Sequence, residues 1–245
     1  MDFATIILAA GKGKRMKSDI PKVLHSLNGR PMVHYVIDTA RAIGSQKIVL
    51  IIGYKKEMVI NATRKYPVEF VVQEEQLGTG HAVRQCESIF RDYKGDVLIL
   101  SGDVPLLAPS TLQELITIQQ KEKPLATLLT AEMEDPTGYG RIVRNKNGYV
   151  TKIVEHKDAN EETLQIKEIN VGIYIFNSQA LFETLPLVNN NNSQGEYYLP
   201  DVVKIYVGRG EKVAAILTPN VEETHGINDI DQLKRAEQIL ITRFS

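Results

Sequence analysis

Residues 3–16 read FATIILAAGKGKRM, a mostly apolar run that passes directly into a loop of glycines and basic residues. The continuous run over residues 3–10 predicts a buried β-strand. In an open α/β sheet, ligands bind beyond the carboxyl ends of the strands. The two glycines would let backbone N–H groups approach an anion, the basic residues add charge, and a following helix would add its dipole. The stretch therefore predicts a polyphosphate-binding loop.

The loop differs from two well-known phosphate-binding motifs. A dinucleotide-binding fingerprint needs a third glycine where Met16 stands, and a Walker P-loop needs a glycine before its Lys-Ser pair, where the chain again has Met16. Taken alone, the loop also fits a solvated basic turn. Arg15 and Lys22, which follows a proline, are the candidate cations for a polyphosphate.

Similar apolar runs recur in the first half of the chain, separated by segments with the apolar spacing of amphipathic helices. We predict strands over residues 47–52, 68–72 and 96–100, and helices over residues 32–43, 57–63 and 80–90. Alternating strands and helices indicate right-handed βαβ crossovers. The predicted fold is therefore α/β, a Rossmann-like, doubly wound and mostly parallel sheet with helices on both faces.

After about residue 109 the pattern becomes mixed, and we expect added antiparallel strands along one edge of the sheet. A helix over residues 110–120 would be capped by Ser110, and the Asn-Lys-Asn-Gly stretch at 145–148 predicts a hairpin turn. An amphipathic helix covers residues 230–244. Further strands are predicted over residues 126–132, 140–144, 149–155 and 173–176.

Composition limits the class of protein. The 245 residues are 43% hydrophobic and 24% charged, with a net charge of −1, so neither nucleic acid nor an anionic membrane is an expected partner. No apolar stretch approaches the ~18 residues of a membrane span. Cys86 is the single cysteine, which fits a reducing, cytoplasmic setting, and its helical context is typical of a core residue rather than a catalytic thiol.

Polar residues follow several predicted strands. Asp103 is well placed to hold Mg²⁺, with a turn or helix cap as the alternative. Gln73 offers a donor and an acceptor for a base edge, close to Gly78 and Thr79. His81 fits a capping or packing role better than a general base.

The second half offers three further candidates. Glu155 and Asn170 suit sugar hydroxyls, although Glu155 also fits a surface charge cluster. Asn228 precedes the last helix, for which a capping role is the default.

Together these segments resemble the bacterial N-acetylglucosamine-1-phosphate uridyltransferases, in particular the uridyltransferase domain of the bifunctional enzyme. The resemblance spans nearly the whole chain. The motifs that carry it are LAAGKGKRM (8–16), PKVLH (21–25), EEQLGTGHAV (74–83), GDVPL (102–106), DPTGYGRIVR (135–144), IVEHKDA (153–159), EIN (168–170), NNNNSQGEYYLPDV (189–202) and GIND (226–229). The first motif is shared by many nucleotidyltransferases, whereas QLGTGHAV, PTGYGRI and VEHKDA together are much more specific.

The resemblance implies a role for each candidate residue. The catalytic pair would be Arg15 and Lys22, and Mg²⁺ would be held by Asp103 and Asn228. The nucleotide would be held by Leu8, Ala9, Ala10, Gly11, Gln73, Gly78, Thr79 and Gly102, and the sugar by Gly140, Glu155 and Asn170. The Lys14 position is commonly Thr in the family, a departure we expect to be tolerated.

The resemblance also implies the domain organisation. Residues 1–228 would form the nucleotidyltransferase domain, divided into a nucleotide-binding half (1–109) and a sugar-binding half (110–228), and residues 229–245 the C-terminal helix. The bifunctional enzymes continue into a trimer-forming, left-handed β-helix with acetyltransferase activity. No hexapeptide repeat is present, so that activity and that trimer are not expected of this chain.

The implied reaction is transfer of UMP from UTP to N-acetylglucosamine 1-phosphate, which yields UDP-N-acetylglucosamine for cell-wall precursor synthesis and releases pyrophosphate. One alternative is uridylyl or thymidylyl transfer to another sugar 1-phosphate. A second is a non-catalytic nucleotide-sugar sensor, which the intact set of Arg15, Lys22 and Asp103 disfavours.

Overall fold

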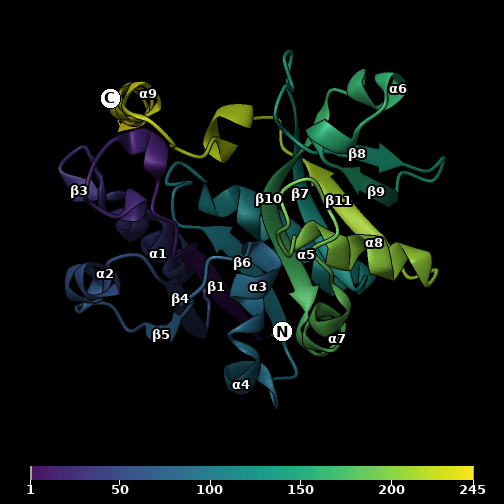
Figure 1. Cartoon of the computed structure of the whole chain (residues 1–245), viewed down its shortest axis with the longest axis horizontal. Coiled ribbons are helices and arrows are strands. Elements are labelled where there is room, and N and C mark those ends of the chain that lie inside the picture. Colours follow the sequence, from purple (N-terminus) through teal and green to yellow (C-terminus); the bar gives the residue numbers. More distant parts are fainter. Residues whose placement is uncertain (1, 245) are drawn as a thin grey trace.

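The computed structural model describes residues 2–244 and consists of a central sheet with helices packed on both faces (Figure 1). Met1 and Ser245, the outer ends of the predicted ranges 1–228 and 229–245, lie outside the described residues. Within the described part of the chain, no helix is long and apolar enough to span a bilayer.

The strands and helices are as follows. The strands are β1 (Phe3–Ala9), β2 (Ser26–Leu27), β3 (Arg30–Pro31), β4 (Lys47–Ile52), β5 (Glu69–Val72), β6 (Asp96–Ser101), β7 (Ala126–Glu132), β8 (Arg141–Arg144), β9 (Val150–Val154), β10 (Glu168–Asn177) and β11 (Val213–Leu217). The α-helices are α1 (Met32–Ala42), α2 (Lys56–Thr63), α3 (Thr79–Arg84), α4 (Glu87–Phe90), α5 (Pro109–Glu122), α6 (Glu161–Leu164), α7 (Ser178–Thr184), α8 (Pro200–Gly208) and α9 (Ile230–Phe244). Short 3-10 turns are η1 (Lys14–Met16), η2 (Lys22–Leu24), η3 (His156–Asp158), η4 (Leu185–Leu187) and η5 (Val221–Thr224).

The main sheet has the strand order β11-β7-β10-β6-β1-β4-β5, with β8 and β9 attached through β10. Strands β1, β4, β5 and β6 pair in parallel, as do β7 and β11, whereas β10 is antiparallel to both of its neighbours. The prediction of a doubly wound, mostly parallel sheet is confirmed.

The expected position of the antiparallel strands is wrong. Strand β10 is longer than residues 173–176, and it lies between β6 and β7 rather than at an edge. A register shift between Asn170 and Ile173, with Gly172 at a φ of 78°, interrupts the strand, so its first part lacks a regular apolar pattern. The crossover through α5 places β7 two positions from β6, and β10 fills the gap.

The two faces of the sheet bury separate cores, which explains why β1 is apolar throughout. Ala4 and Ile6 pack with residues of α3, α4, α7 and α8. Phe3 and Ile7 pack on the opposite face with residues of α1, α2 and α5. Because both faces are covered, an alternating pattern would place polar side chains in one of the cores.

The single helix predicted over residues 80–90 is also wrong, because the chain forms α3 and α4 instead. The backbone N–H groups of Gln85 and Cys86 bond three residues back, to Ala82 and Val83, which tightens the last turn of α3. Cys86 is fully buried, and burial raises the pKa of its thiol to about 12. The interpretation of Cys86 as a core residue is confirmed.

Ser110 does not cap α5, which begins one residue earlier at Pro109. A proline at the first helical position is favourable because its φ is already helical. The carboxylate of the distant Glu223 accepts from Ala108 N at 3.0 Å and from Thr111 Oγ1 at 2.7 Å. This contact could not be predicted from the local sequence. The helices α7 and α8 and the strand β11 were not predicted either.

Helix α9 returns to the beginning of the chain, where it lies beside the β2–β3 ribbon (Figure 1, upper left). Glu237 Oε1 of α9 accepts a hydrogen bond from Asn28 N at 3.2 Å. The small core beneath α9 contains Leu27, Met32, Leu106, Ile227, Ala236 and Leu240. The segment that leads into α9 is thereby held at the carboxyl ends of the central strands.

Candidate active site

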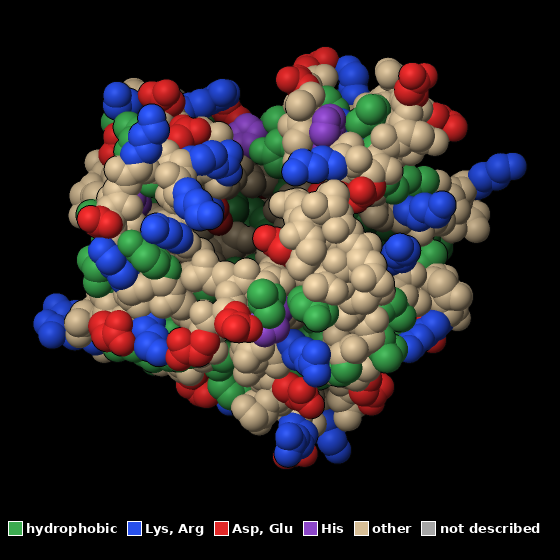
Figure 2. Space-filling view, in the orientation of Figure 1, with side chains coloured by type: hydrophobic (Ala, Val, Ile, Leu, Met, Phe, Trp, Pro, Cys, Tyr) green, Lys and Arg blue, Asp and Glu red, His purple; other side chains and the backbone are tan. Residues whose placement is uncertain are grey.

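A cleft of about 510 Å³ opens beyond the carboxyl ends of β1, β5 and β6. Figure 2 shows a hollow at the centre of the molecule, with Lys and Arg side chains gathered along its left rim. The predicted site residues that line the cleft are Leu8, Ala9, Ala10, Gly11, Lys22, Gln73, Gly78, Thr79 and Asp103. The structure therefore brings most of the predicted nucleotide-binding residues together at the expected edge of the sheet.

The glycine-rich loop after β1 has a specific shape. Gly13 has a φ of 66°, and a Cβ atom there would lie 2.6 Å from Cβ of Lys22, so this position requires glycine. The loop continues into the 3-10 turn η1, not into the α-helix whose dipole was expected to contribute. Any anion held here would therefore depend on backbone N–H groups and basic side chains alone.

Arg15 and Gly102, which were predicted to contact the nucleotide or its phosphates, do not line the cleft. Arg15 is exposed and forms no hydrogen bond or ion pair within residues 2–244. Its charge does act on Tyr139: burial raises the pKa of that phenol, and Arg15 opposes the rise. Gly102 packs between β1 and the turn η2, because its N–H donates to Leu8 O at 2.9 Å and a Cβ would lie 2.9 Å from Val23.

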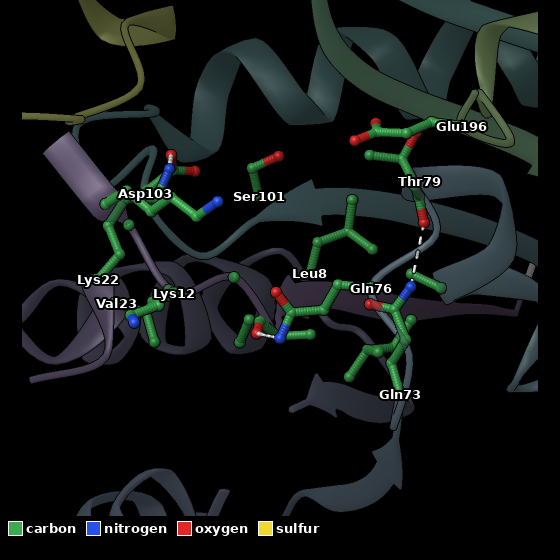
Figure 3. Close-up of a pocket in the computed structure, with 18 residues that line it drawn as sticks. Leu8, Lys12, Lys22, Val23, Gln73, Gln76, Thr79, Ser101, Asp103 and Glu196 are labelled. Atoms are coloured by element: carbon green, nitrogen blue, oxygen red, sulfur yellow. Dashed lines mark hydrogen bonds and ion pairs between the residues drawn. The ribbon is translucent and has the colours of Figure 1, made fainter. Parts of the chain in front are cut away.

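Lys22, Asp103 and Asn228 meet at one end of the cleft. The Lys22 ammonium donates to a carboxylate oxygen of Asp103 and, at 3.0 Å, to Oδ1 of Asn228. Figure 3 shows Lys22 and Asp103. Asp103 follows β6, and its carbonyl accepts from Ile227 N at 2.9 Å, which fixes the approach of the segment before α9. The two oxygens already share one cation, so they are close enough to coordinate another.

The side chain of Asn228 does not cap α9, contrary to the default interpretation. Asp229 is the residue whose side chain accepts from a backbone N–H of α9, that of Gln232, at 2.9 Å. The Asn228 amide nitrogen donates to Gly226 O at 2.9 Å, which turns its oxygen toward Lys22. Asn228 therefore presents an oxygen to the site.

The donor set at this end of the cleft fits a hard cation. A carboxylate and an amide oxygen are ligands that Mg²⁺ accepts, and this ion is usually held by one or two protein ligands together with substrate phosphates. Among the residues that the structure describes, no group of three His, Cys, Asp or Glu side chains forms a self-sufficient metal site. The residues present suit a metal that arrives with a phosphate ligand.

The region predicted to face a base has a second, structural role. Gly78 has a φ of 108°, and a Cβ there would lie 2.6 Å from Tyr197 O. Thr79 Oγ1 accepts from Leu199 N at 3.1 Å, which fastens the segment before α8 to the start of α3. Packing of this segment is therefore one reason for the Gly-Thr pair. Gln73 is more than nine-tenths buried, and the small part of it that stays accessible lines the cleft.

The predicted sugar-binding residues cluster together, outside the residues that line the cleft. Gly140 O accepts from Asn170 N at 2.8 Å, and a Cβ at Gly140 would lie 3.1 Å from Glu155 Oε1. Burial raises the pKa of Glu155, and the nearby carboxylates Asp158 and Asp201 raise it further. A hydroxyl group that donated to Glu155 would stabilise the ionised form.

The residues that line the cleft without having been predicted include Gln76, Ser101 and Glu196. Gln76 Nε2 donates to Ala10 O at 3.0 Å and so supports the loop after β1. Ser101 ends β6, so its position beside Asp103 was the available signal. Glu196 belongs to the segment before α8, and no local pattern shows that this segment folds over the cleft.

Comparison with known proteins agrees with this geometry. The chain matches the family described as "Nucleotidyl transferase" over residues 4–221. It is 52% identical over 240 residues to the bifunctional protein GlmU of Halalkalibacterium halodurans, covering 98% of this chain and 52% of that protein. It is 51% identical over 232 residues to the GlmU of Bacillus licheniformis, with coverage of 95% and 51%. The chain thus spans about half the length of these curated relatives.

Two solved structures share the fold at 19% sequence identity. One is a UDP-glucose pyrophosphorylase complexed with UDP-glucose, with a TM-score of 0.76 and coverage of 99% of this chain and 100% of the other. The other is a putative glucose-1-phosphate thymidylyltransferase from Bacillus anthracis, with a TM-score of 0.74 and coverage of 97% and 94%. Because the family match runs from the first strand to beyond the last strand of the sheet, the chain belongs to the nucleotidyl transferase family.

Proposed function

We propose that this chain transfers UMP from UTP to N-acetylglucosamine 1-phosphate, forming UDP-N-acetylglucosamine and pyrophosphate. The meeting of Lys22, Asp103 and Asn228 at the end of a cleft beyond the strands is the observation that carries the proposal. Identity of about half with the GlmU proteins supports the choice of nucleotide and sugar.

The reaction needs no general base. A sugar phosphate oxygen attacks the α-phosphorus of UTP, and the bond from that phosphorus to the bridging oxygen of pyrophosphate breaks. The second pKa of a phosphate monoester is about 6, so the nucleophile is already ionised at neutral pH. The barrier comes from repulsion between anions and from charge on the leaving pyrophosphate. Positioning and charge neutralisation therefore account for catalysis.

We assign that neutralisation to Lys22, Arg15 and a divalent metal. Asp103 and Asn228 would hold Mg²⁺, which would supply positive charge to the phosphate oxygens. With those two oxygens engaged, the Lys22 ammonium becomes available to a phosphate. Arg15, exposed beside the loop, is free to meet the same anion.

The sugar is assigned to the cluster of Gly140, Glu155 and Asn170. Glu155 would accept a hydrogen bond from a sugar hydroxyl, and the missing side chain at Gly140 leaves room beside it. In this proposal residues 1–109 supply most nucleotide contacts and residues 110–228 the sugar contacts, with Asn228 joining the two halves.

A panel of substrates tests the proposal. Pyrophosphate release is measured with UTP, dTTP and CTP, each combined with N-acetylglucosamine 1-phosphate or glucose 1-phosphate. The highest kcat/KM is expected for UTP with N-acetylglucosamine 1-phosphate. A preference for glucose 1-phosphate would favour the alternative acceptor, and binding of nucleotide sugars with no release in any pair would favour a sensor.

A further inference from the structure

Asp103 and Lys22 form an ion pair that is largely withdrawn from water. The side chain of Asp103 is 14% exposed and that of Lys22 is 19% exposed. Among the side chains that the structure describes, no other cation forms an ion pair with the Asp103 carboxylate. A carboxylate that has lost most of its water needs a positive charge beside it. In the chain without ligands, Lys22 supplies that charge.

The same ammonium also holds the second oxygen of the predicted metal site. Its nitrogen donates to Asn228 Oδ1 at 3.0 Å as well as to Asp103 Oδ2. The orientation of the Asn228 amide is unambiguous, because Gly226 O only accepts and must face the amide nitrogen, at 2.9 Å. The ammonium only donates and must face the amide oxygen. Both oxygens that would ligate Mg²⁺ therefore already share one cation.

A metal ion bound to these two oxygens would meet the Lys22 ammonium at close range. Mg²⁺ draws its oxygen ligands in to about 2.0–2.1 Å and demands near-octahedral geometry around itself. An ammonium held by the same two oxygens takes up lone pairs and space that this geometry needs. The two cations would also repel each other strongly where little water screens them. Metal binding to Asp103 and Asn228 is therefore unfavourable until the ammonium moves away.

Lys22 has a second position within its reach, because its stem runs along the glycine-rich loop. A Cβ atom at Gly13 would lie 2.6 Å from Cβ, 3.1 Å from Cγ and 3.3 Å from Cδ of Lys22. Lys22 and residues 11–14 of the loop line the same cleft. A lysine ammonium is a point charge on a flexible four-carbon stem. Rotation about the last bonds of this stem would carry the charge from Asp103 to an anion held by the loop.

We propose that Lys22 excludes the divalent metal from the nucleotide-free site, and that a nucleotide phosphate ends this exclusion by drawing the ammonium away. Metal and nucleotide then bind cooperatively, since the contact between Lys22 and the phosphate provides the free energy that frees the two oxygens. The inference rests on the proposed transfer from UTP. It gives Lys22 a role before the chemical step, in addition to its role during it.

The test measures Mn²⁺ binding to the chain alone, by electron paramagnetic resonance without nucleotide. Lys22→Met removes the charge and keeps an unbranched stem, so it should bind Mn²⁺ about 10–100-fold more tightly than wild type. Lys22→Arg keeps a cation and should bind as weakly as wild type. In the double variant Lys22→Met/Asp103→Ala the gain should disappear, which assigns it to this site.

A second arm adds saturating UTP. Chelation of Mn²⁺ by UTP itself is the same for every variant, so differences between variants report on the protein. UTP should tighten Mn²⁺ binding less in Lys22→Met than in wild type, because the exclusion is already absent. Thermal unfolding gives an independent readout: Mg²⁺ should raise the melting temperature of Lys22→Met more than that of wild type, since it binds the folded variant more tightly.

Lys12→Met is the matched control. Lys12 lines the same cleft, but its ammonium lies over the ring of Tyr54, 5.2 Å from the centroid. Because Lys12 is exposed, loss of its charge should change Mn²⁺ affinity less than about 3-fold. This variant separates direct exchange at Asp103 from a general change in the charge of the cleft.

Equal Mn²⁺ affinity in wild type and folded Lys22→Met overturns the inference. So does an equal gain in Lys12→Met, a gain that survives Asp103→Ala, or equal tightening by UTP in wild type and Lys22→Met. If Lys22→Met does not fold, Lys22→Leu supplies the same comparison. Failure of the proposed function is separate, because the first arm uses no substrate: the wild-type chain would then release no pyrophosphate from UTP.

Discussion

The ammonium of Lys22 donates a hydrogen bond to the side-chain oxygen of Asn228 at 3.0 Å, across 206 residues of sequence. The contact joins the turn after the glycine-rich loop to the segment that leads into α9. It also places a cation where the oxygens of Asp103 and Asn228 converge. The chemistry of the site therefore depends on which cation, the Lys22 ammonium or a metal ion, lies between these two oxygens.

Lys22→Met should lower kcat about 10²–10³-fold, because one preorganised charge is removed from the reacting phosphates. The melting temperature should fall as well, because the largely buried Asp103 carboxylate loses its cation. Pyrophosphate release and thermal unfolding are the measurements. Lys47→Met is the control: Lys47 forms an ion pair with Glu69 at 3.3 Å, away from the cleft, and its loss should leave turnover intact. Equal turnover in wild type and Lys22→Met would remove Lys22 from the mechanism.

Arg15→Ala should reduce kcat by a similar factor while leaving stability unchanged, since Arg15 is exposed. The comparison is Arg64→Ala, an exposed arginine at the end of α2 that should be silent in both assays. Steady-state kinetics and a thermal melt provide the readouts. Normal turnover in Arg15→Ala would show that the exposed position seen here is also its position during catalysis.

Chelation with EDTA should abolish pyrophosphate release, and excess Mg²⁺ should restore it. Asp103→Ala should remain inactive at ordinary Mg²⁺ concentrations, because the site then keeps only the neutral oxygen of Asn228. Mn²⁺ binding in the presence of UTP, followed by electron paramagnetic resonance, tests the ligand role directly. Full activity in chelator, or Mn²⁺ binding unaffected by Asp103→Ala, would contradict the assignment.

Glu155 should make stability depend on pH in a definite direction. Burial raises the pKa of Glu155 in the folded state above its usual value of 4.5. At a pH between 4.5 and the raised pKa, the folded state therefore keeps a proton that the unfolded state has released. This contribution to stability therefore falls as pH rises through that window, and above it the ionised, buried carboxylate costs stability. Glu155→Gln should melt higher than wild type at pH 8, and the difference should shrink toward pH 4. A constant difference across this range would contradict the prediction.

Glu223 should matter for stability and not for chemistry. Its buried carboxylate accepts from Ala108 N, Thr111 Oγ1 and Thr218 Oγ1, so Glu223→Ala leaves three donors without their partner. The expected loss is about 3 kcal/mol in the free energy of unfolding, measured by urea denaturation. The neighbouring Glu222→Ala removes only an exposed pair with Arg235 and should cost less than about 1 kcal/mol. Similar losses in both variants would refute this role.

Helices and strands could be predicted from the sequence where the spacing of apolar residues within one segment indicated the element. The strand at residues 3–10 matches β1 closely because its apolar run is buried almost throughout, and the helix at 230–244 matches α9 because its apolar residues recur at helical spacing. The position of β10 was not accessible, because insertion between β6 and β7 depends on pairing partners far away in sequence.

The site followed the same division. Asp103 and Gln73 could be placed from their positions after strands, and both line the cleft. Glu196 carries no local signal, and His81 carries only that of a capping or packing residue, since the surroundings of each depend on the segment before α8 folding onto α3. Asn228 was assigned only by resemblance, because nothing in its neighbours shows that it contacts Lys22.

The interior place of β10 also bears on synthesis by the ribosome. Strand β6 has β1 on one side as soon as the first half of the chain has emerged, but its other edge is covered only by β10. A nascent chain that has passed Asp103 but not Asn177 therefore presents an open, apolar strand edge, a template for pairing with the wrong chain. Translation of the β7–β9 region is thus the interval in which β6 of the nascent chain lacks its second neighbour.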